Sequence, residues 1–181
     1  MNAPWSQMVT DIGDDWRGAP GSAARKFAGF LILDPLLLVI LYRFSHAAYL
    51  AGRTYRPMAY AIKAMNLFVY GADIHPGATL GRRVQFAHPV GVVIGGDVVA
   101  GDDLTLEARV AIGGDEHRQQ PRIGHGVSIH TGACVAGGIT IGDGAVIGAN
   151  AVVLKNVPSE HVAVGVPARH SPRGLQKPSK P

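Results

Sequence analysis

The sequence predicts a mainly β fold: a solenoid of short parallel strands that follows a short α-helical N-terminal region. Three observations predict it: aliphatic residues recur every six positions from residue 74 to residue 153, Gly is raised to 24 of 181 residues, and the period is interrupted only twice. Neither the helical period nor the simple strand period explains a six-residue repeat. At this length we expect one buried core with a small N-terminal appendage.

Residues 1–70 are expected to form a mostly helical N-terminal region. Within it, segment 27–41 is strongly apolar, but it contains Asp34-Pro35 and is shorter than the roughly 20 residues that a spanning helix needs. We favour a buried or subunit-packing helix, because short apolar runs are usually core, and peripheral membrane contact stays open as the alternative. The first 21 residues lack the basic start and apolar run of a secretory signal, so we expect a cytoplasmic protein.

The repeat lies between residues 71 and 158 and is carried by two rows of apolar residues. One row has a six-residue spacing and consists of Ile74, Leu80, Phe86, Ile94, Ala100, Leu106, Ile112, Ile123, Ile129, Val135, Ile141, Ile147 and Val153. A second row stands four positions later, as at Ala78, Val84, Val98, Leu104, Val127, Ala133, Ala145 and Ala151. We interpret each hexapeptide as one strand plus one corner, with the aliphatic residue pointing inward. Each buried Ile or Val contributes about 1.5 to 3 kcal/mol before chain entropy is subtracted, so the rungs must stack continuously.

Two interruptions and a set of glycines mark where the chain leaves the coil or bends within it. The step from Phe86 to Ile94 is eight residues, and the step from Ile112 to Ile123 is eleven, which predicts a loop at 113–122. A Gly after the aliphatic position suits a bend after each short strand, as at Gly81, Gly95, Gly101, Gly124, Gly142 and Gly148. Residues 159–181 are expected to be a C-terminal extension and tail.

The net charge and the cysteine content limit the kinds of binding partner and the cellular compartment that we expect. A formal net charge of +4 favours an anionic partner, and a phosphate-bearing small molecule satisfies it as well as nucleic acid does. Aromatic residues do not interleave the basic residues of the tail, so we expect no nucleic-acid binding. Cys134 is the single cysteine, which excludes an intrachain disulfide and a Cys-based zinc site and suits a reducing compartment. At its repeat corner we interpret it as a small semi-buried filler.

Beyond the repeat pattern, several stretches of the sequence resemble known signatures. They are 72–76 (Ala-Asp-Ile-His-Pro), 88–95 (His-Pro-Val-Gly-Val-Val-Ile-Gly), 110–114 (Val-Ala-Ile-Gly-Gly), 165–169 (Gly-Val-Pro-Ala-Arg) and, upstream, 42–46 (Tyr-Arg-Phe-Ser-His). In this order they resemble the hexapeptide-repeat acyltransferases, and among these the serine acetyltransferases and their exopolysaccharide (sugar) O-acetyltransferase relatives. The resemblance implies a left-handed parallel β-helix, a homotrimer with active sites between subunits, and acetyl-CoA as acyl donor.

His88 and Asp73 match the family's catalytic pair. Acetyl transfer to a hydroxyl needs a base, and imidazole has a suitable pKa near neutrality. Asp73 lies fifteen residues before His88, close to one full turn of three hexapeptides, so the two could stack on neighbouring rungs. A carboxylate in that place would fix the imidazole tautomer and stabilise the imidazolium. The structural alternative is that His88 caps a turn and Asp73 is a corner residue.

The resemblance also places the pantetheine arm of acetyl-CoA along the C-terminal coils. The positions that match are Gly113, Gly114, Thr131 and Ala149, where small residues let a ligand approach the main chain. Lys155 and Arg169 are candidates for the CoA phosphates, with simple solvation as the alternative. No metal is expected.

The acceptor positions depart from the serine acetyltransferases. Ala87 stands where those enzymes carry an Asp, and Gln119-Gln120 precede Pro121 where they carry Arg-His; the nearest basic pair is His117-Arg118, displaced into the loop. An amino-acid acceptor needs charged partners for its ammonium and its carboxylate, whereas a polyhydroxyl acceptor does not. We therefore predict a sugar or polysaccharide-precursor acceptor, with serine O-acetylation for cysteine biosynthesis as the alternative.

Two other classes of function are known alternatives for a solenoid of this kind. Zinc-dependent carbonic anhydrases share this kind of fold, and His125 and His130 have the five-residue spacing of two of their ligands, with His88 as the third candidate. That reading would leave the acyltransferase signatures unexplained. A non-catalytic scaffold on the same solenoid is disfavoured because Asp73 and His88 are both present.

Overall fold

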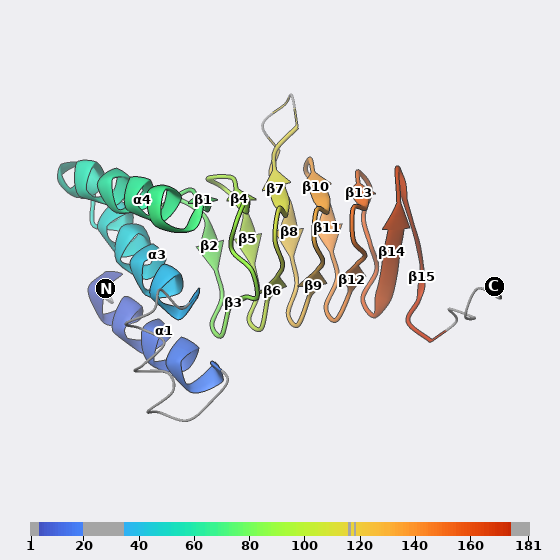
Figure 1. Cartoon of the computed structure of the whole chain (residues 1–181), viewed down its shortest axis with the longest axis horizontal. Coiled ribbons are helices and arrows are strands. Elements are labelled where there is room, and N and C mark those ends of the chain that lie inside the picture. Colours follow the sequence, from blue (N-terminus) through green and yellow to red (C-terminus); the bar gives the residue numbers. More distant parts are fainter. Residues whose placement is uncertain (1–3, 20–34, 116, 118, 175–181) are drawn as a thin grey trace.

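The computed structural model describes residues 4–19, 35–115, 117 and 119–174. Within these residues, three α-helices and a 3-10 turn stand at one end: α1 (Pro4–Gly18), α3 (Pro35–Leu50), η1 (Arg53–Tyr55) and α4 (Arg56–Tyr70). A stack of short strands follows, and a β-hairpin lies at the far end of the stack (Figure 1).

The described strands form three sheets of five, four and six strands, in which strands from successive coils pair in parallel. Sheet A is β1 (Asp73–Ile74), β4 (Val93–Ile94), β7 (Ala111–Gly113), β10 (Cys134–Ala136) and β13 (Val152–Val153). Sheet B is β2 (Thr79–Leu80), β5 (Val99–Ala100), β8 (Arg122–Ile123) and β11 (Thr140–Ile141). Sheet C is β3 (Gln85–Phe86), β6 (Thr105–Leu106), β9 (Ser128–Ile129), β12 (Val146–Ile147), β14 (His161–Gly165) and β15 (Ala168–Pro172), of which the last two pair antiparallel.

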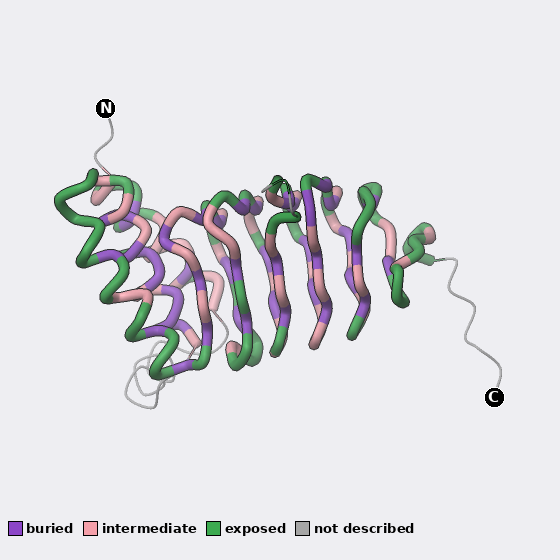
Figure 2. Tube along the Cα trace, turned by 90° about the horizontal axis from the view of Figure 1, so that it is seen from above, coloured by how far each residue is buried: buried purple, intermediate pink, exposed green. Residues whose placement is uncertain are grey.

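The predicted aliphatic row is the core of the solenoid. In sheet A the register stacks Ile74 on Ile94, Ile94 on Ile112, Ile112 on Val135 and Val135 on Val153. All five side chains are buried, and Figure 2 shows that buried segments recur along every coil. Each rung therefore hides its aliphatic side chain against the rungs before and after it, as the repeat predicts.

The glycines at one corner are explained by close approach and not by a special bend. Gly81, Gly101, Gly124 and Gly142 each follow a sheet B strand, and none of them has a positive φ. A Cβ on Gly81 would lie 2.4 Å from the carbonyl carbon of Gly101, which is far inside van der Waals contact. The chain turns after each of these strands, as predicted, but what requires Gly at this position is the close approach of the next coil. The left-handed residues of this corner come two positions later, at Arg83, Asp103, Gly126 and Gly144.

The N-terminal helices cover the open end of the first coil. The Tyr42 hydroxyl donates to the carbonyl oxygen of Ala78 at 2.7 Å and accepts from the Leu80 amide at 3.1 Å. Burial raises the pKa of Tyr42 to about 12. The Arg43 guanidinium donates to the Leu80 carbonyl at 2.6 Å and to Asp15 Oδ2 at 2.9 Å. Polar backbone groups at the edge of the first coil thus find partners in α1 and α3, where an uncovered edge would invite further strand pairing.

The apolar segment predicted at 27–41 is described only from residue 35. That part opens α3, whose Leu38 and Val39 are buried and belong to the same core as the coils. The described part thus packs as a buried helix, while residues 27–34 lie outside the described residues. None of the described helices is long and apolar enough to cross a membrane.

Candidate functional site

The corner that leads from sheet C to sheet A carries most of the predicted site. Strand register pairs Phe86 with Leu106, Leu106 with Ile129 and Ile129 with Ile147. The residues that follow these four form what we call the C–A corner: Ala87, Glu107, His130 and Gly148, then His88, Ala108, Thr131 and Ala149. Because the first coil is two residues longer here, its Val90 and not its His88 bonds to the coil of Ala108, through the Arg109 amide. His88, Thr131 and Ala149, predicted on separate grounds, thus share one corner of successive coils.

His88 lies on the turn between β3 and β4, and its side chain is exposed. The turn is held against the start of the first coil, because the Gly91 amide donates to the Gly71 carbonyl and the Asp73 amide to the Val92 carbonyl, at 2.9 and 2.8 Å. The eight-residue step thus projects a histidine out of the coil. Ala87, the residue before His88, has no polar side-chain group.

Asp73 is the first residue of β1, and β1 pairs with β4, the strand that follows the turn of His88. Its Oδ1 lies 2.7 Å from Nζ of Lys63 on α4. Among the described residues, no hydrogen bond or ion pair joins Asp73 to His88. The structure therefore places the predicted pair on adjacent segments, with the carboxylate bound to a lysine that the sequence did not point to.

Glu107 forms a cluster that sequence reasoning missed. Its carboxylate accepts from Thr131 Oγ1 at 2.7 Å, from the Thr131 amide at 2.9 Å and from His130 Nδ1 at 2.9 Å. The Thr131 hydroxyl, followed by His130, lowers the pKa of Glu107 to about 2. The available signal was the repeat itself, since Glu107 and His130 each follow an aliphatic position one coil apart.

Of the remaining donor-site candidates, Gly113, Gly114 and Lys155 lie at the other end of the sheet A strands, whereas Arg169 lies in sheet C. Gly113 ends β7, and a Cβ there would meet nothing within 4 Å. Gly114 begins the long loop, and Lys155 follows β13 two coils further on; its side chain is exposed. Arg169 is exposed on β15, opposite Val164. Within one chain, Gly113, Gly114 and Lys155 are therefore separate from Thr131 and Ala149. Arg169 is not, because it stands opposite Val164, which lies against Gly148 of the C–A corner.

The long loop leaves the coil between β7 and β8 (Figure 1). Asp115 shapes it by accepting from the backbone amides of His117 and Gln119 at 2.9 and 3.0 Å. Arg118 lies outside the described residues. Gln120 turns inward: its Oε1 is buried with no hydrogen-bond partner in the described part of the chain, and it would lie 2.8 Å from a Cβ at Gly95.

The histidines of the zinc alternative do not converge. His125 Nδ1 accepts from the Asp102 amide at 3.0 Å, whereas His130 Nδ1 is bound to Glu107. In residues 4–19, 35–115, 117 and 119–174, no three His, Cys, Asp or Glu side chains are arranged to hold a metal ion. The zinc reading therefore finds no ligand set there.

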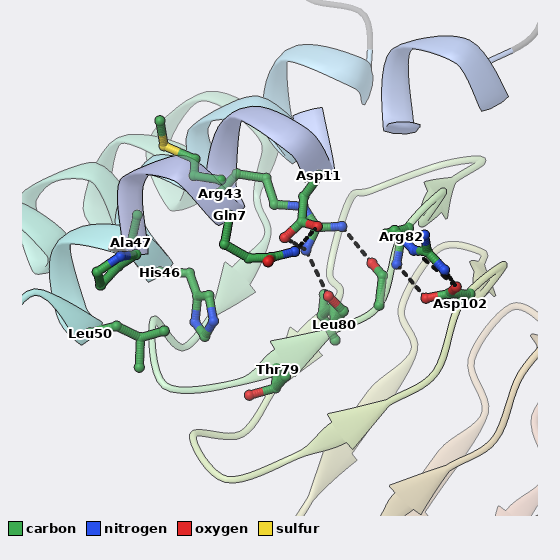
Figure 3. A pocket seen from close by; sticks show the side chains of 13 residues that line it. Gln7, Asp11, Arg43, His46, Ala47, Leu50, Thr79, Leu80, Arg82 and Asp102 are labelled. Carbon is green, nitrogen blue, oxygen red and sulfur yellow. Dashed lines mark hydrogen bonds and ion pairs between the residues drawn. The ribbon is translucent and has the colours of Figure 1, made fainter. Parts of the chain in front are cut away.

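A cavity of about 420 Å³ lies between α1, α3 and the first coil, away from the C–A corner. Figure 3 shows charged side chains around it, and these are already paired. Arg82 Nη2 lies 2.6 Å from Asp102 Oδ2, and Arg43 binds Asp15 and the Leu80 carbonyl. None of the predicted site residues lines the cavity. Because the charged side chains around it are bound to one another or to the backbone, we assign them a structural role.

Comparison with known proteins decides the family. The family described as bacterial transferase hexapeptide (six repeats) matches residues 120–155. Over 151 residues the chain is 37% identical to the serine acetyltransferase of Helicobacter pylori strain J99, which covers 82% of this chain and 87% of that protein. The chain belongs to the serine acetyltransferase family.

Solved structures of serine acetyltransferases agree with this assignment. A serine acetyltransferase in complex with CoA has a TM-score of 0.78 and 30% identity, over 92% of this chain and 70% of that chain. Soybean serine acetyltransferase complexed with serine has a TM-score of 0.79 and 33% identity, over 94% and 70%. The predicted family, the fold class of a left-handed parallel β-helix with N-terminal helices, and the enzyme class of acyltransferase are thereby confirmed.

Proposed function

We propose that this chain transfers the acetyl group of acetyl-CoA to the hydroxyl of L-serine, with His88 as general base. The observation that carries the proposal is the relationship to the Helicobacter pylori serine acetyltransferase, which extends over 87% of that protein. The structures of relatives bound to CoA and to serine support the two substrates.

His88 would act on the acceptor hydroxyl. As the serine oxygen forms its bond to the thioester carbonyl carbon, the imidazole takes the hydroxyl proton. The carbon–sulfur bond then breaks, and the imidazolium returns that proton to the CoA thiolate, so the base is restored after each turnover. An exposed imidazole on a projecting turn suits this role, because both substrates must reach the same nitrogen.

Asp73 would hold His88 during the transfer. Lys63 engages Oδ1 of Asp73, which leaves Oδ2 for the imidazole of the adjacent turn. A carboxylate there fixes the tautomer and stabilises the imidazolium. Lys63 then keeps the carboxylate in place.

The donor would lie along the coils, with its acyl end at His88. Thr131 and Ala149 continue the corner on which His88 stands, so they suit the pantetheine arm. Gly113 and Gly114 offer an open backbone surface, and Lys155 and Arg169 supply exposed cations for the phosphates. Because Gly113, Gly114 and Lys155 lie at the opposite end of the sheet A strands from Thr131 and Ala149, a complete donor site would need residues from two subunits.

A homotrimer would bring those residues together. Apolar side chains stand exposed beside the turn that carries His88, where Val90 is 64% and Val93 47% exposed, and Phe68 at the end of α4 is 91% exposed. Exposed apolar groups in one region mark protein contacts more often than free surface. A second copy packed there would cover them and remove water from the reacting groups.

A sugar hydroxyl is the second candidate acceptor, and specific residues favour it. Ala87 places no carboxylate beside His88, and Gln119 and Gln120 supply neutral amides where a carboxylate substrate would need a cation. The buried, unpartnered Oε1 of Gln120 also suits a hydroxyl donor. The predicted sugar acceptor remains unconfirmed, and the relatives favour serine.

An acceptor panel tests the proposal. Purified protein and acetyl-CoA are incubated with L-serine, L-homoserine, glycerol or nucleotide sugars, and the acetylated product is identified by mass spectrometry. Formation of O-acetylserine as the main product supports the proposal. Acetylation of a sugar with no reaction of serine contradicts it and establishes the second candidate.

A further inference from the structure

Both oxygens of the Glu107 carboxylate accept hydrogen bonds from neighbouring residues of the C–A corner. It accepts from the Thr131 hydroxyl at 2.7 Å, the Thr131 amide at 2.9 Å and His130 Nδ1 at 2.9 Å. These donors hold it ionised and leave it facing His130 and Thr131, away from the coil of His88. Glu107 is therefore poorly placed to bind a substrate itself, but it is well placed to fix its neighbours.

His130 is oriented by this contact. Because an ionised carboxylate accepts the Nδ1 proton, the neutral ring carries its hydrogen on Nδ1 and presents Nε2 as an acceptor. The His130 side chain is 42% exposed, so Nε2 is open to a ligand. A carboxylate-oriented imidazole with one free nitrogen is thus built on the same corner as His88, and the proposed reaction does not use it.

The strand register sets the distance between the coil of His88 and the coil of His130. Phe86 and Ile129, at the ends of the strands before them, are two coils apart, so at about 4.8 Å per coil these coils lie about 10 Å apart along the corner. Between and beyond them the corner carries the small residues Ala108 and Ala149. An extended ligand with its reactive end at His88 would pass His130 on its way toward the last coils. A serine molecule held at His88 would be too short to reach it.

We propose that Nε2 of His130 accepts a hydrogen bond from an amide N–H of the pantetheine arm of acetyl-CoA, with Glu107 as the residue that positions the ring. The inference rests on the proposed function, because it assumes that the thioester lies at His88. It adds a side-chain contact to a stretch of corner that otherwise offers the ligand small side chains and backbone.

Calorimetric titration of the full-length protein tests this directly, because binding is measured without turnover. The probes are CoA and adenosine 3′,5′-bisphosphate, which lacks the pantetheine arm. One hydrogen bond contributes about 0.5 to 1.5 kcal/mol, so His130→Ala should raise the Kd for CoA by roughly 2- to 12-fold and leave the Kd for the bisphosphate unchanged. His130→Gln, which keeps an acceptor oxygen, should recover part of the loss.

His125→Ala is the matched control, since His125 is an exposed histidine on a different corner. Glu107→Ala should weaken CoA binding in the same sense as His130→Ala. Steady-state kinetics should show a raised KM for acetyl-CoA with kcat and the acceptor KM unchanged. Unchanged CoA affinity in His130→Ala, an equal loss for the bisphosphate, or a change confined to the acceptor KM would each overturn the inference. If no acceptor is turned over at all, the proposed function fails while the calorimetry still decides the role of His130.

Discussion

Nζ of Lys63 lies 2.7 Å from Oδ1 of Asp73, so the carboxylate proposed to orient the catalytic base is anchored by a helix outside the β-helix. Lys63 belongs to α4, the helix that leads into the first coil. The N-terminal helices therefore do more than cover the end of the solenoid. They supply a charged partner to the proposed active site, so the position of Asp73 depends on how α4 is packed.

Asp73→Asn and Lys63→Met should differ in severity. Asp73→Asn removes the charge that stabilises the imidazolium and should lower kcat by roughly 10- to 100-fold, which corresponds to about 1.4 to 2.7 kcal/mol. Lys63→Met removes a partly exposed ion pair that only steadies the carboxylate, so kcat should fall by no more than about threefold. Steady-state kinetics at saturating acetyl-CoA measure both. Equal losses in the two variants would show that Lys63 takes part in the chemistry.

The Glu107 cluster should make stability depend on acid pH. Because the pKa of Glu107 is lowered from 4.5 to about 2 in the folded chain, its contribution to stability is present above pH 4.5 and is lost as the pH falls toward 2. Urea unfolding of wild type should lose more stability between pH 6 and pH 3 than that of Glu107→Gln, which cannot titrate. Parallel losses in both proteins would contradict the role given to Glu107.

Tyr42→Phe should destabilise the capped end of the solenoid. The substitution leaves the Ala78 carbonyl and the Leu80 amide without their buried partner, which costs about 1 to 3 kcal/mol. Chemical denaturation with a matched Tyr49→Phe control measures the difference, because no hydrogen bond of the Tyr49 hydroxyl accompanies its ring contacts in the described structure. A loss no greater than that of the control would show that the cap contributes little.

Gly81→Ala should be much more harmful than Gly113→Ala. A Cβ at Gly81 would press on the backbone of Gly101 at 2.4 Å, whereas one at Gly113 would meet nothing within 4 Å. Overpacking of this kind typically costs 1 to 3 kcal/mol, so the free energy of unfolding should fall by about that amount in Gly81→Ala alone. Similar stability in the two variants would mean that the coils can separate locally to accept a methyl group.

The coil was predictable because its cause is local and repeated. One inward aliphatic residue per hexapeptide, such as Ile94 or Ile112, is enough to set the register with the next rung. The reason for Gly81 was not predictable, because the contact that demands it comes from the following coil. The pairing of Tyr42 and Arg43 with the first coil likewise depends on how α3 docks, which no spacing in the sequence reveals.

The site was predictable to the extent that it follows the repeat. His88, Thr131 and Ala149 fall on one corner because each stands two residues after an inward position. Glu107 was missed because a charged residue at a corner resembles ordinary solvated surface until its partners are seen. Lys63 was missed because its contact with Asp73 depends on how α4 packs beside β1, which the sequence does not show.

The most direct test of the account is thiol release from acetyl-CoA by wild type and His88→Ala with L-serine as acceptor. The account predicts serine-dependent release by wild type and a fall of about 10²- to 10⁴-fold in the variant, while its thermal melting and its affinity for CoA stay unchanged. Release by His88→Ala at the wild-type rate would contradict the central claim that His88 is the general base.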